Sequence, residues 1–406
     1  MNVICGKDKC TGCRACLNIC SHSAIQMVNN KLNVEIAVIN KKKCIDCGLC
    51  KLVCPQNNVD DIFYLPKKCY ASWSLDNTIR WRSASGGVAA ELYRWAIEND
   101  IWIAGVSYTE EREASFTLTK DFEKINSFQN SKYVYSNMKY VYKEIIDKLK
   151  KREGVLFIGL PCQVDGLRKY LKIKKVSSEQ LILVDLICHG TAPNFYLVQH
   201  IEKIEHKKQM HTDEFYFRDP DTYTYTFTFT LKQQGKSFYS KKVESNDTYQ
   251  VGYHKGIIYR ENCYQCKYAC MERTGDITLA DFSYVGTKLE CTYDNKNVSC
   301  VLVNSSKGID VIQKLEKKEI IFCEERPIEE EIDYEQMLHR PTPKPQERKR
   351  FVEEYSKSKD FDSAMWKAAR KKLVINEIIQ KSHIRQVKVF LSKIIPKQIK
   401  NIIKNK

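Results

Sequence analysis

The sequence lacks the features that would direct a protein into or across a membrane. No run of about 18 apolar residues occurs, so no segment is expected to span a bilayer. The first residues, Met1 to Cys5, contain neither a basic region nor an apolar core, which predicts that the chain is not exported. Thiols in a reducing compartment stay free or bind metals, so the 18 cysteines are not expected to form disulfides. The predicted location is cytoplasmic.

The first 340 residues also lack a strong net charge. Residues 341–406 contribute most of the total charge of +16, because they contain 18 Lys and Arg against 6 Asp and Glu. A body without a basic face of its own is not expected to bind nucleic acid. The acidic stretch from Glu324 to Glu335 is predicted to be solvated.

Cysteine, in contrast, is abundant and regularly spaced. Two runs have two, two and three residues between successive cysteines: Cys10, Cys13, Cys16 and Cys20, and then Cys44, Cys47, Cys50 and Cys54. This doubled spacing is typical of bacterial ferredoxins with two [4Fe–4S] clusters, in which the fourth cysteine of each run binds the other cluster. Structural zinc sites, the alternative for clustered cysteines, usually use separated pairs of ligands. The spacing therefore favours two [4Fe–4S] clusters.

The ligands are assigned on this basis. The first cluster site comprises Cys10, Cys13, Cys16 and Cys54. The second cluster site comprises Cys20, Cys44, Cys47 and Cys50. A proline follows Cys54 but not Cys20, and its absence after Cys20 is not expected to remove that ligand.

From Cys69 onward the pattern predicts an α/β fold. Two short apolar runs, residues 155–158 and 181–187, are predicted to be buried strands. Cys162 follows the first and Cys188 follows the second. Ligands in open α/β sheets bind at the carboxyl ends of the strands, so these cysteines are candidates for a site. The alternative is that both are small buried thiols of the core.

Two later stretches complete this part of the chain. Aromatic residues alternate between Phe215 and Phe229, which predicts a β-hairpin. Cys263 and Cys266 have the spacing of metal ligands on a turn, and Cys270 follows them closely.

Small residues from Ser83 to Gly87 precede an amphipathic run that begins at Val88. The free N–H groups and the positive end of a helix that starts this way attract a phosphate. A plain helix cap with a glycine turn is the alternative.

Six stretches follow the doubled cysteine run in a fixed order. They are Ser83-Ala-Ser-Gly-Gly, Ser131-Lys-Tyr-Val, Gly159-Leu-Pro-Cys-Gln-Val-Asp-Gly-Leu-Arg, Asp185-Leu-Ile-Cys-His-Gly, Arg260-x2-Cys-x2-Cys-x-Tyr-Ala and Gly275-Asp-Ile-Thr-Leu-Ala-Asp-Phe. Together they resemble the coenzyme F-420 hydrogenase/dehydrogenase beta-subunit family, over roughly residues 1 to 340.

The resemblance implies an FAD-dependent iron–sulfur oxidoreductase. Members of the family hold FAD and pass electrons between clusters and an organic two-electron partner, which is the deazaflavin F-420 in the hydrogenases and dehydrogenases. Many bacterial members lie near polysaccharide-synthesis genes. For this chain we expect electrons from a ferredoxin or another redox donor protein, and a small-molecule two-electron acceptor. The alternatives are a non-catalytic electron-transfer subunit and a structural protein with zinc at Cys263 and Cys266.

The resemblance also implies site residues in the body. A third [4Fe–4S] cluster is predicted at the body cysteine site, which comprises Cys162, Cys188, Cys263 and Cys266. Cys270 is the substitute ligand, and ordinary buried thiols are the alternative.

The FAD-binding residues implied by the resemblance are expected to be Ser83, Ser85, Gly86, Gly87 and Asp281. Lys132 is the catalytic candidate, facing negative charge on the reduced flavin or substrate, and a solvated surface lysine is its alternative.

The predicted fold is an α+β dicluster ferredoxin module, then an α/β flavoprotein domain and a helical basic tail. The expected boundaries are residues 1–62, 69–340 and 341–406, and Pro341, Pro343 and Pro345 are expected to end the globular part.

The end of the chain suggests a surface for lipid. After Glu377 there is no acidic residue, and apolar residues from Ile384 to Ile403 recur at helical spacing between lysines. A basic amphipathic helix suits an anionic membrane surface, which predicts peripheral docking on the inner face of the cytoplasmic membrane. Packing of the same stripe on the body or on a partner is the alternative.

Overall fold

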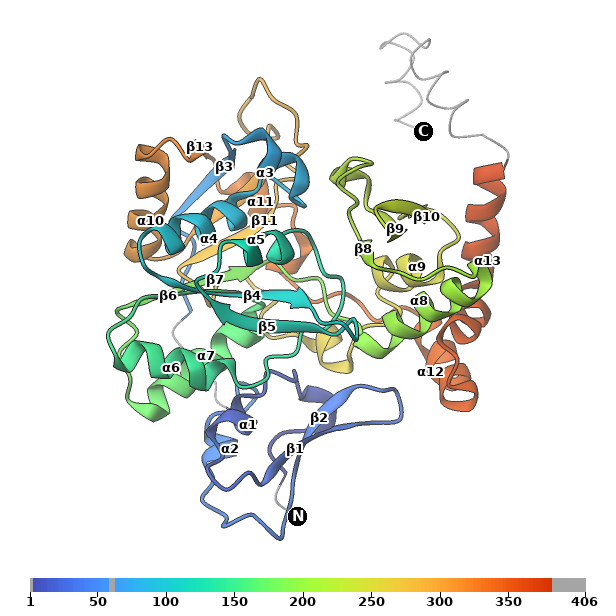
Figure 1. Cartoon of the computed structure of the whole chain (residues 1–406), viewed down its shortest axis with the longest axis horizontal. Coiled ribbons are helices and arrows are strands. Elements are labelled where there is room, and N and C mark those ends of the chain that lie inside the picture. The colour runs from blue at the N-terminus through green and yellow to red at the C-terminus, as the bar shows by residue number, and fades with distance from the viewer. Residues whose placement is uncertain (1–2, 58–62, 382–406) are drawn as a thin grey trace.

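A mixed sheet lies at the centre of the molecule (Figure 1). The computed structural model describes residues 3–57 and 63–381, and within these ranges the largest sheet has eight strands in the order β13-β3-β12-β11-β7-β6-β4-β5. Their bounds are β3 (Lys68–Ser74), β4 (Trp102–Tyr108), β5 (Ala114–Thr119), β6 (Val155–Gly159), β7 (Leu181–Leu186), β11 (Ile277–Asp281), β12 (Ser299–Val303) and β13 (Ile321–Arg326).

The strand directions create one functional edge. β4, β6, β7 and β11 pair in parallel, whereas β12 is antiparallel to both β11 and β3. β3 therefore points the same way as the parallel strands. The carboxyl ends of β3, β11, β7 and β6 and the amino end of β12 thus lie along one side of the sheet, which we call the carboxyl edge.

Helices cover both faces of this sheet, because alternate residues of the buried strands point to opposite sides. Leu156 and Ile182 face the cluster of apolar residues that includes α4 (Val88–Glu98), α5 (Glu123–Phe128) and α10 (Ser306–Lys317). Phe157 and Leu183 face the other cluster, with α6 (Val141–Lys150) and α7 (Pro161–Lys174). The predicted α/β domain is therefore present, with a layer of helices on each side.

The N-terminal module packs below the sheet in Figure 1, on the side of α6 and α7. Its elements are η1 (Lys7–Lys9), α1 (Ala15–Ile19), β1 (Ile25–Asn29), β2 (Glu35–Ile39) and α2 (Leu49–Leu52). Ile19 and Val53 of the module share one apolar core with Tyr142 of α6 and Leu167 of α7. The ferredoxin-like region is thus attached to the body by a common core.

A second lobe lies beside the sheet (Figure 1). It contains a three-stranded sheet and four helices: β8 (Glu214–Tyr216), β9 (Thr228–Gln233), β10 (Lys236–Lys242), α8 (Asn194–Lys208), α9 (Thr248–His254), α12 (Glu347–Ser358) and α13 (Phe361–Lys381). Its core includes Phe351 and Tyr355 of α12 and Met365 and Leu373 of α13. The expected end of the globular part at Pro341 was therefore wrong, because the apolar faces of both helices are buried in this core.

Two further predictions about local structure were only partly right. The stretch from Phe215 to Phe229 begins in β8 and ends in β9, which pair in antiparallel fashion as predicted. The residues between the two strands are not extended, because β8 ends at Tyr216 and a 3-10 turn, η2 (Thr224–Thr226), precedes β9. The acidic stretch from Glu324 is not simply solvated, because Glu330 and Glu331 of α11 (Glu329–Ile332) are buried. The remaining elements are α3 (Asn77–Arg82), η3 (Glu261–Gln265) and η4 (Gln336–Leu338).

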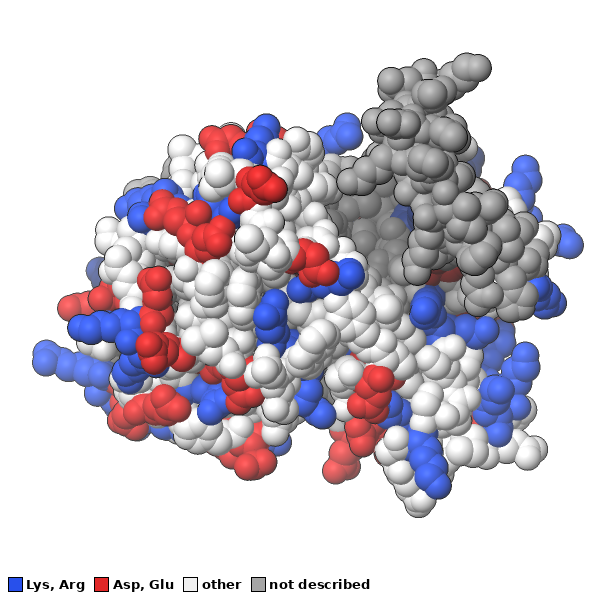
Figure 2. Space-filling view, turned by 90° about the horizontal axis from the view of Figure 1, so that it is seen from above, with Lys and Arg blue, Asp and Glu red and all other residues white. Residues whose placement is uncertain are grey.

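Acidic and basic side chains are mixed on the face of the body that Figure 2 shows. Among the described residues, no helix combines the length and the apolar character needed to cross a membrane. The predicted amphipathic stripe from Ile384 to Ile403 lies outside the described residues.

Candidate metal and cofactor centre

The two cysteine runs fold in the same way. Gly12 and Asp46 occupy equivalent positions in the two runs, and both have positive φ, 72° and 55°. Arg14 and Gly48 are also equivalent, with φ of 59° and 76°, and each immediately precedes a short helix. Such left-handed residues turn the backbone sharply, so successive cysteines of a run can face a common point.

The second cluster site surrounds a cavity. Cys20, Cys44, Cys47 and Cys50 all line a space of about 220 Å³ between α2 and the β1–β2 hairpin. The first of these residues comes from the other run, as the spacing predicted for exchanged fourth ligands. The donor set of four thiols around one open space therefore fits a [4Fe–4S] cluster.

The first cluster site lines a second, smaller hollow. Cys10, Cys13, Cys16 and Cys54 face it, and Cys5, which is outside the doubled pattern, faces it too. A hydrogen bond from the Cys5 thiol, together with the Arg260 cation, lowers the pKa of Cys10 to about 5 despite its burial. Burial raises the pKa of Cys13 to about 12. The site is thus largely withdrawn from water.

A single metal ion has no comparable place in the described residues. No group of three or more His, Cys, Asp or Glu side chains within them is arranged to hold one ion. A four-iron cube binds each thiolate through a different iron atom, so it holds its ligands farther apart than one ion does.

The four predicted residues of the body cysteine site lie together. Cys162 is in the first turn of α7, Cys188 follows β7, Cys263 lies in η3 and Cys266 immediately follows η3. Burial raises the pKa of Cys162, and the nearby thiols of Cys266, Cys188 and Cys263 raise it further. Burial and Cys263 likewise raise the pKa of Cys266, to about 12. Four thiols from three parts of the chain therefore converge at the carboxyl edge.

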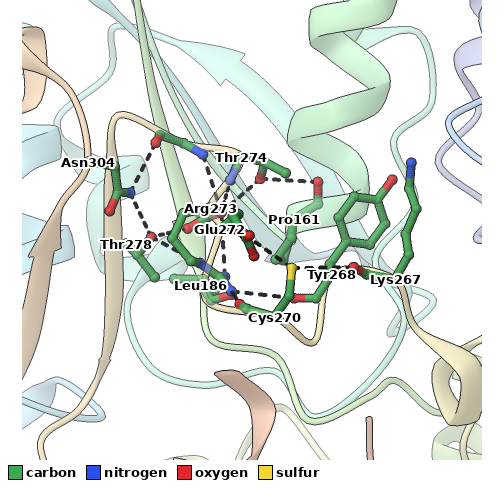
Figure 3. A network of polar contacts seen from close by, with 12 residues as sticks. Pro161, Leu186, Lys267, Tyr268, Cys270, Glu272, Arg273, Thr274, Thr278 and Asn304 are labelled. Carbon is green, nitrogen blue, oxygen red and sulfur yellow. Dashed lines mark hydrogen bonds and ion pairs between the residues drawn. The ribbon is translucent and has the colours of Figure 1, made fainter. Parts of the chain in front are cut away.

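A polar network holds these segments in place (Figure 3). The buried Arg273 donates to the carbonyl oxygens of Cys270, at 3.2 Å, and Leu186, also at 3.2 Å. Thr274 donates through its hydroxyl to the carbonyl oxygen of Pro161, at 3.3 Å. The turn after Cys266 is thereby tied to the ends of β7 and β6. The thiol of Cys270 instead donates to carbonyl oxygens of its own turn.

The three thiol groups form a series. Cys50 of the second site is close enough to Cys16 of the first site to contribute to its raised pKa, after the larger effects of burial and of the three other cysteines of the first site. Cys13 of the first site likewise contributes to the raised pKa of Cys162 in the body cysteine site. A Cβ atom added to Gly166 of α7 would lie 3.3 Å from Cys13 Sγ, so the helix passes directly against the first site. The order is therefore second site, first site, body cysteine site.

The predicted FAD loop, residues 83–87, also lies at the carboxyl edge. The hydroxyl of Ser85 donates to the carbonyl oxygen of Val298 at 2.7 Å, and the Gly86 N–H donates to Ser299 Oγ at 2.9 Å. Gly87 precedes α4 with φ of 89°, and no side chain of the described residues caps this helix. Ser83, the first residue of the loop, is buried. The uncapped start of α4 fits an anionic group such as a pyrophosphate.

Gly86 has a packing role of its own. A Cβ atom there would lie 2.3 Å from the carbonyl oxygen of Ser72 and 2.8 Å from the Ser299 nitrogen. No side chain fits against this backbone, so a bulky substitution would disturb the sheet as well as any cofactor.

Lys132 does not lie free on the surface. Its ammonium donates to the carbonyl oxygens of Phe128 at 3.0 Å, Gln129 at 2.7 Å and Asn130 at 3.3 Å, where α5 ends. Desolvation lowers the pKa of Lys132 to about 7. The side chain thus caps a helix C-terminus, and its three donors have partners.

Asp281, at the end of β11, is paired with an arginine that sequence reasoning missed. Arg218 donates to both carboxylate oxygens of Asp281, to the Ala84 carbonyl oxygen at 2.6 Å and to Tyr133 Oη at 2.7 Å. It joins the FAD loop, the sheet and the second lobe. The only feature of the sequence that could have indicated a role for Arg218 is its position, as a charged residue directly after the apolar run 215–217.

Arg260 was part of a recognised stretch but was given no role. Its guanidinium is buried and donates to the carbonyl oxygens of Cys10 at 3.2 Å and Glu35 at 2.9 Å. It lies just before Cys263, so one cation connects the first cluster site with the body cysteine site.

Comparisons with known proteins agree with this division of the chain. The family described as the C terminus of the coenzyme F420 hydrogenase/dehydrogenase beta subunit matches residues 152–330. A 4Fe-4S dicluster domain matches residues 9–58. No curated protein matches the chain. Among solved structures, a chain of the xenon-derivatised F420-reducing [NiFe] hydrogenase complex from Methanosarcina barkeri matches with a TM-score of 0.43 and 16% identity, over 82% of this chain and 96% of that chain.

Proposed function

Because residues 152–330 match the C terminus of the coenzyme F420 hydrogenase/dehydrogenase beta subunit and residues 9–58 match a 4Fe-4S dicluster domain, we propose that the chain is an iron–sulfur flavoprotein oxidoreductase. In this proposal it takes electrons from a low-potential donor such as a ferredoxin. The electrons pass through [4Fe–4S] clusters at the first and second cluster sites, and a third at the body cysteine site, to FAD. The final acceptor is an organic two-electron compound, for which coenzyme F420 is one candidate.

One observation carries the proposal most directly, namely the series of three thiol groups. Cys13 and Cys162 belong to different groups, yet the Cys13 thiol contributes to the raised pKa of Cys162, and Gly166 leaves no side chain between α7 and Cys13. When bound, the clusters would supply one-electron steps and FAD would supply a two-electron step. The protein's part is to bury the thiols, to place Arg260 beside Cys10 and to keep the three groups at fixed distances.

Groups at the carboxyl edge of the sheet support the proposed position of FAD. The uncapped N-terminus of α4 offers N–H groups to a pyrophosphate, and Arg218 fixes the nearby loop through the Ala84 carbonyl oxygen. Asp281 balances the Arg218 charge, and Lys132 holds the end of α5 near Tyr133. In this proposal Lys132 acts on the flavin or substrate through its positive charge, which its lowered pKa makes dependent on pH near neutrality.

Anaerobic purification with quantification of iron, sulfide and flavin tests the proposal. Three clusters and one flavin predict about twelve iron atoms and one FAD per chain. A preparation with iron and sulfide at this level but without flavin would overturn the flavoprotein part. A preparation that contains zinc in place of iron would overturn the whole proposal.

The second candidate is a non-catalytic electron-transfer subunit. The exposed position of Cys47, beside the cavity of the second cluster site, favours an electron-donating partner at that end in either case. Turnover by the purified chain alone, with reduced viologen as the donor and F420 or a quinone as the acceptor, separates the two candidates. The polysaccharide context and the membrane surface stay predictions.

A further inference from the structure

Glu331 is buried without a partner at the carboxyl edge. It lies in α11 with 1% of its surface exposed, and neither carboxyl oxygen has a hydrogen-bond partner among the described residues. Its neighbour Glu330 shows the usual arrangement: that carboxylate accepts bonds from Arg326 and from the N–H groups of Gly286 and Lys288. Of two adjacent buried acids in one short helix, Glu330 therefore has hydrogen-bond partners and Glu331 has none among the described residues.

An unsatisfied buried carboxyl group destabilises a fold, because it loses its hydrogen bonds to water and gains none. Glu331 therefore needs an explanation other than stability. Burial raises its pKa to about 9, and the charges of Glu335 and Asp281 contribute to the increase. Tyr284 and Cys300 are the other titratable groups that face it, and burial raises the pKa of each. Glu331 is thus a neutral acid at pH 7.

Two further acids are near enough to Glu331 for their charges to contribute to its raised pKa. Glu335 is one helical turn further on, and its side chain is 14% exposed and lies 4.0 Å from the exposed His189. Asp281 is held by Arg218, which also donates to the Ala84 carbonyl oxygen of the FAD loop. Asp281 is already paired with a cation, so it serves as a fixed negative charge and not as a proton carrier.

We propose that Glu331 delivers protons from solvent, through Glu335, to the two-electron centre at the carboxyl edge. This inference rests on the proposed function. Reduction of one oxidised flavin or one organic acceptor takes two electrons, from two oxidations of a one-electron donor protein, and two protons from solvent. For each proton the O–H bond of Glu331 breaks as the proton leaves, and Glu335 restores it with a proton from water. Electrons arrive from the thiol series and protons from the side of α11.

The test uses the anaerobic full-length holoprotein, mixed rapidly with reduced methyl viologen, which donates electrons but no protons. Cluster reduction and flavin reduction are followed by absorbance, and proton uptake is followed with a pH indicator. In the natural protein the flavin phase is expected to slow as the pH rises through about 9, because the neutral acid is lost. In Glu331→Gln the flavin phase is expected to be about tenfold slower at pH 7, independent of pH from 8 to 10, with the cluster phase unchanged.

Matched variants separate proton delivery from folding. Glu329→Gln changes an exposed acid of the same helix and should leave both phases unchanged. Glu331→Met should raise the midpoint of thermal unfolding and still show the slow flavin phase. Glu335→Gln should slow the flavin phase and raise its solvent deuterium isotope effect, because proton transfer then limits the rate.

The outcomes also separate this inference from the proposed function. A natural protein without a flavin phase would overturn both. A normal flavin phase in Glu331→Gln, with unaltered pH dependence, would overturn proton delivery by Glu331 and leave the proposed function intact.

Discussion

Gly166 marks the point where α7 meets the first cluster site. A Cβ atom there would lie 3.0 Å from Tyr142 Oη and 3.3 Å from Cys13 Sγ, which is closer than ordinary packing allows. We expect Gly166→Ala to displace Cys13, to cost about 1 kcal/mol or more of stability and to make the first cluster labile to chelators. Iron release to a chelator measures this. Gly6→Ala is the control, because its Cβ would meet only the flexible Lys9 side chain, at 3.7 Å.

His200 holds the second lobe together through two buried acids. Its Nδ1 lies 2.7 Å from Asp362 Oδ1 of α13, and its Nε2 lies 2.9 Å from Asp247 Oδ2 at the start of α9. Burial alone would lower its pKa, but the two carboxylates raise it to about 10. The histidine is therefore charged in the folded protein at pH 7. Its stabilising effect is complete below the unfolded pKa of about 6.5 and is lost as the pH rises through about 10.

His200→Gln is expected to destabilise the protein by about 3 kcal/mol at pH 7, because it leaves two buried carboxylates without their cation. Urea unfolding at pH 7 and at pH 10 measures the effect, and the difference from the natural protein should shrink at the higher pH. His206→Gln, on the exposed side of the same helix, should change neither value. An equal loss at both pH values would contradict the charged pairing.

At the scale of elements, α12 and α13 belong to the body. Phe351, Tyr355, Phe361 and Met365 are fully buried in the core of the second lobe. A chain that ends at Arg340 exposes the apolar residues of that core and is expected to be insoluble or unfolded. A chain that ends at Lys381 keeps every described contact and should fold, with the same midpoint of thermal unfolding as the full-length protein.

The chain ending at Lys381 also tests the membrane prediction without disturbing the fold. Full-length protein is expected to sediment with anionic vesicles at low salt, and the shortened chain is expected to remain in solution. Equal binding by the two chains would remove the last 25 residues, numbers 382–406, as the membrane contact.

The stretch from Phe215 to Phe229 shows why the length of one strand pair was misjudged, because only its ends pair, in β8 and β9. The alternating aromatic residues suggested a pleat, but Tyr223 and Phe227 have positive φ, 88° and 51°. The ring of Tyr223 packs against Trp81, with centroids 5.5 Å apart, and the Arg218 guanidinium lies 3.8 Å from the centre of the Phe227 ring. The period of two arose from contacts with separate elements, which no local pattern reveals.

At the scale of the whole molecule, the body cysteine site connects the two parts of the chain. The double variant Cys162→Ser and Cys188→Ser is expected to lose about four iron atoms, the content of one cluster. The remaining clusters should still be reduced by viologen, whereas flavin reduction should slow strongly. Iron analysis and rapid mixing measure both effects. Cys291→Ser, outside all three thiol groups, is the control, and a similar iron loss in it would contradict the assignment.

The sequence by itself determined the grouping of the eight N-terminal cysteines, strands of the α/β domain such as β6 and β7, and the resemblance that the family match over residues 152–330 supports. The cysteine spacing is sufficient because each run folds through a few left-handed residues, so ligand positions depend on local geometry. The cysteines that the spacing grouped are those that line each of the two cavities, while the iron itself stays a prediction. Buried strands such as β6 and β7 are likewise readable, because a short apolar run encodes them locally.

Only the tertiary structure decided the rest. The proximity of Cys13 to α7, the pairing of Arg218 with Asp281 and the burial of Glu331 depend on how distant segments meet at the carboxyl edge. Local composition made Glu331 look solvated and residues 341–381 look like a tail, because charge density is visible in a sequence whereas the order of strands and lobes is not. A side chain's surroundings are set by the strands and helices that pack against it, and these come from far along the chain.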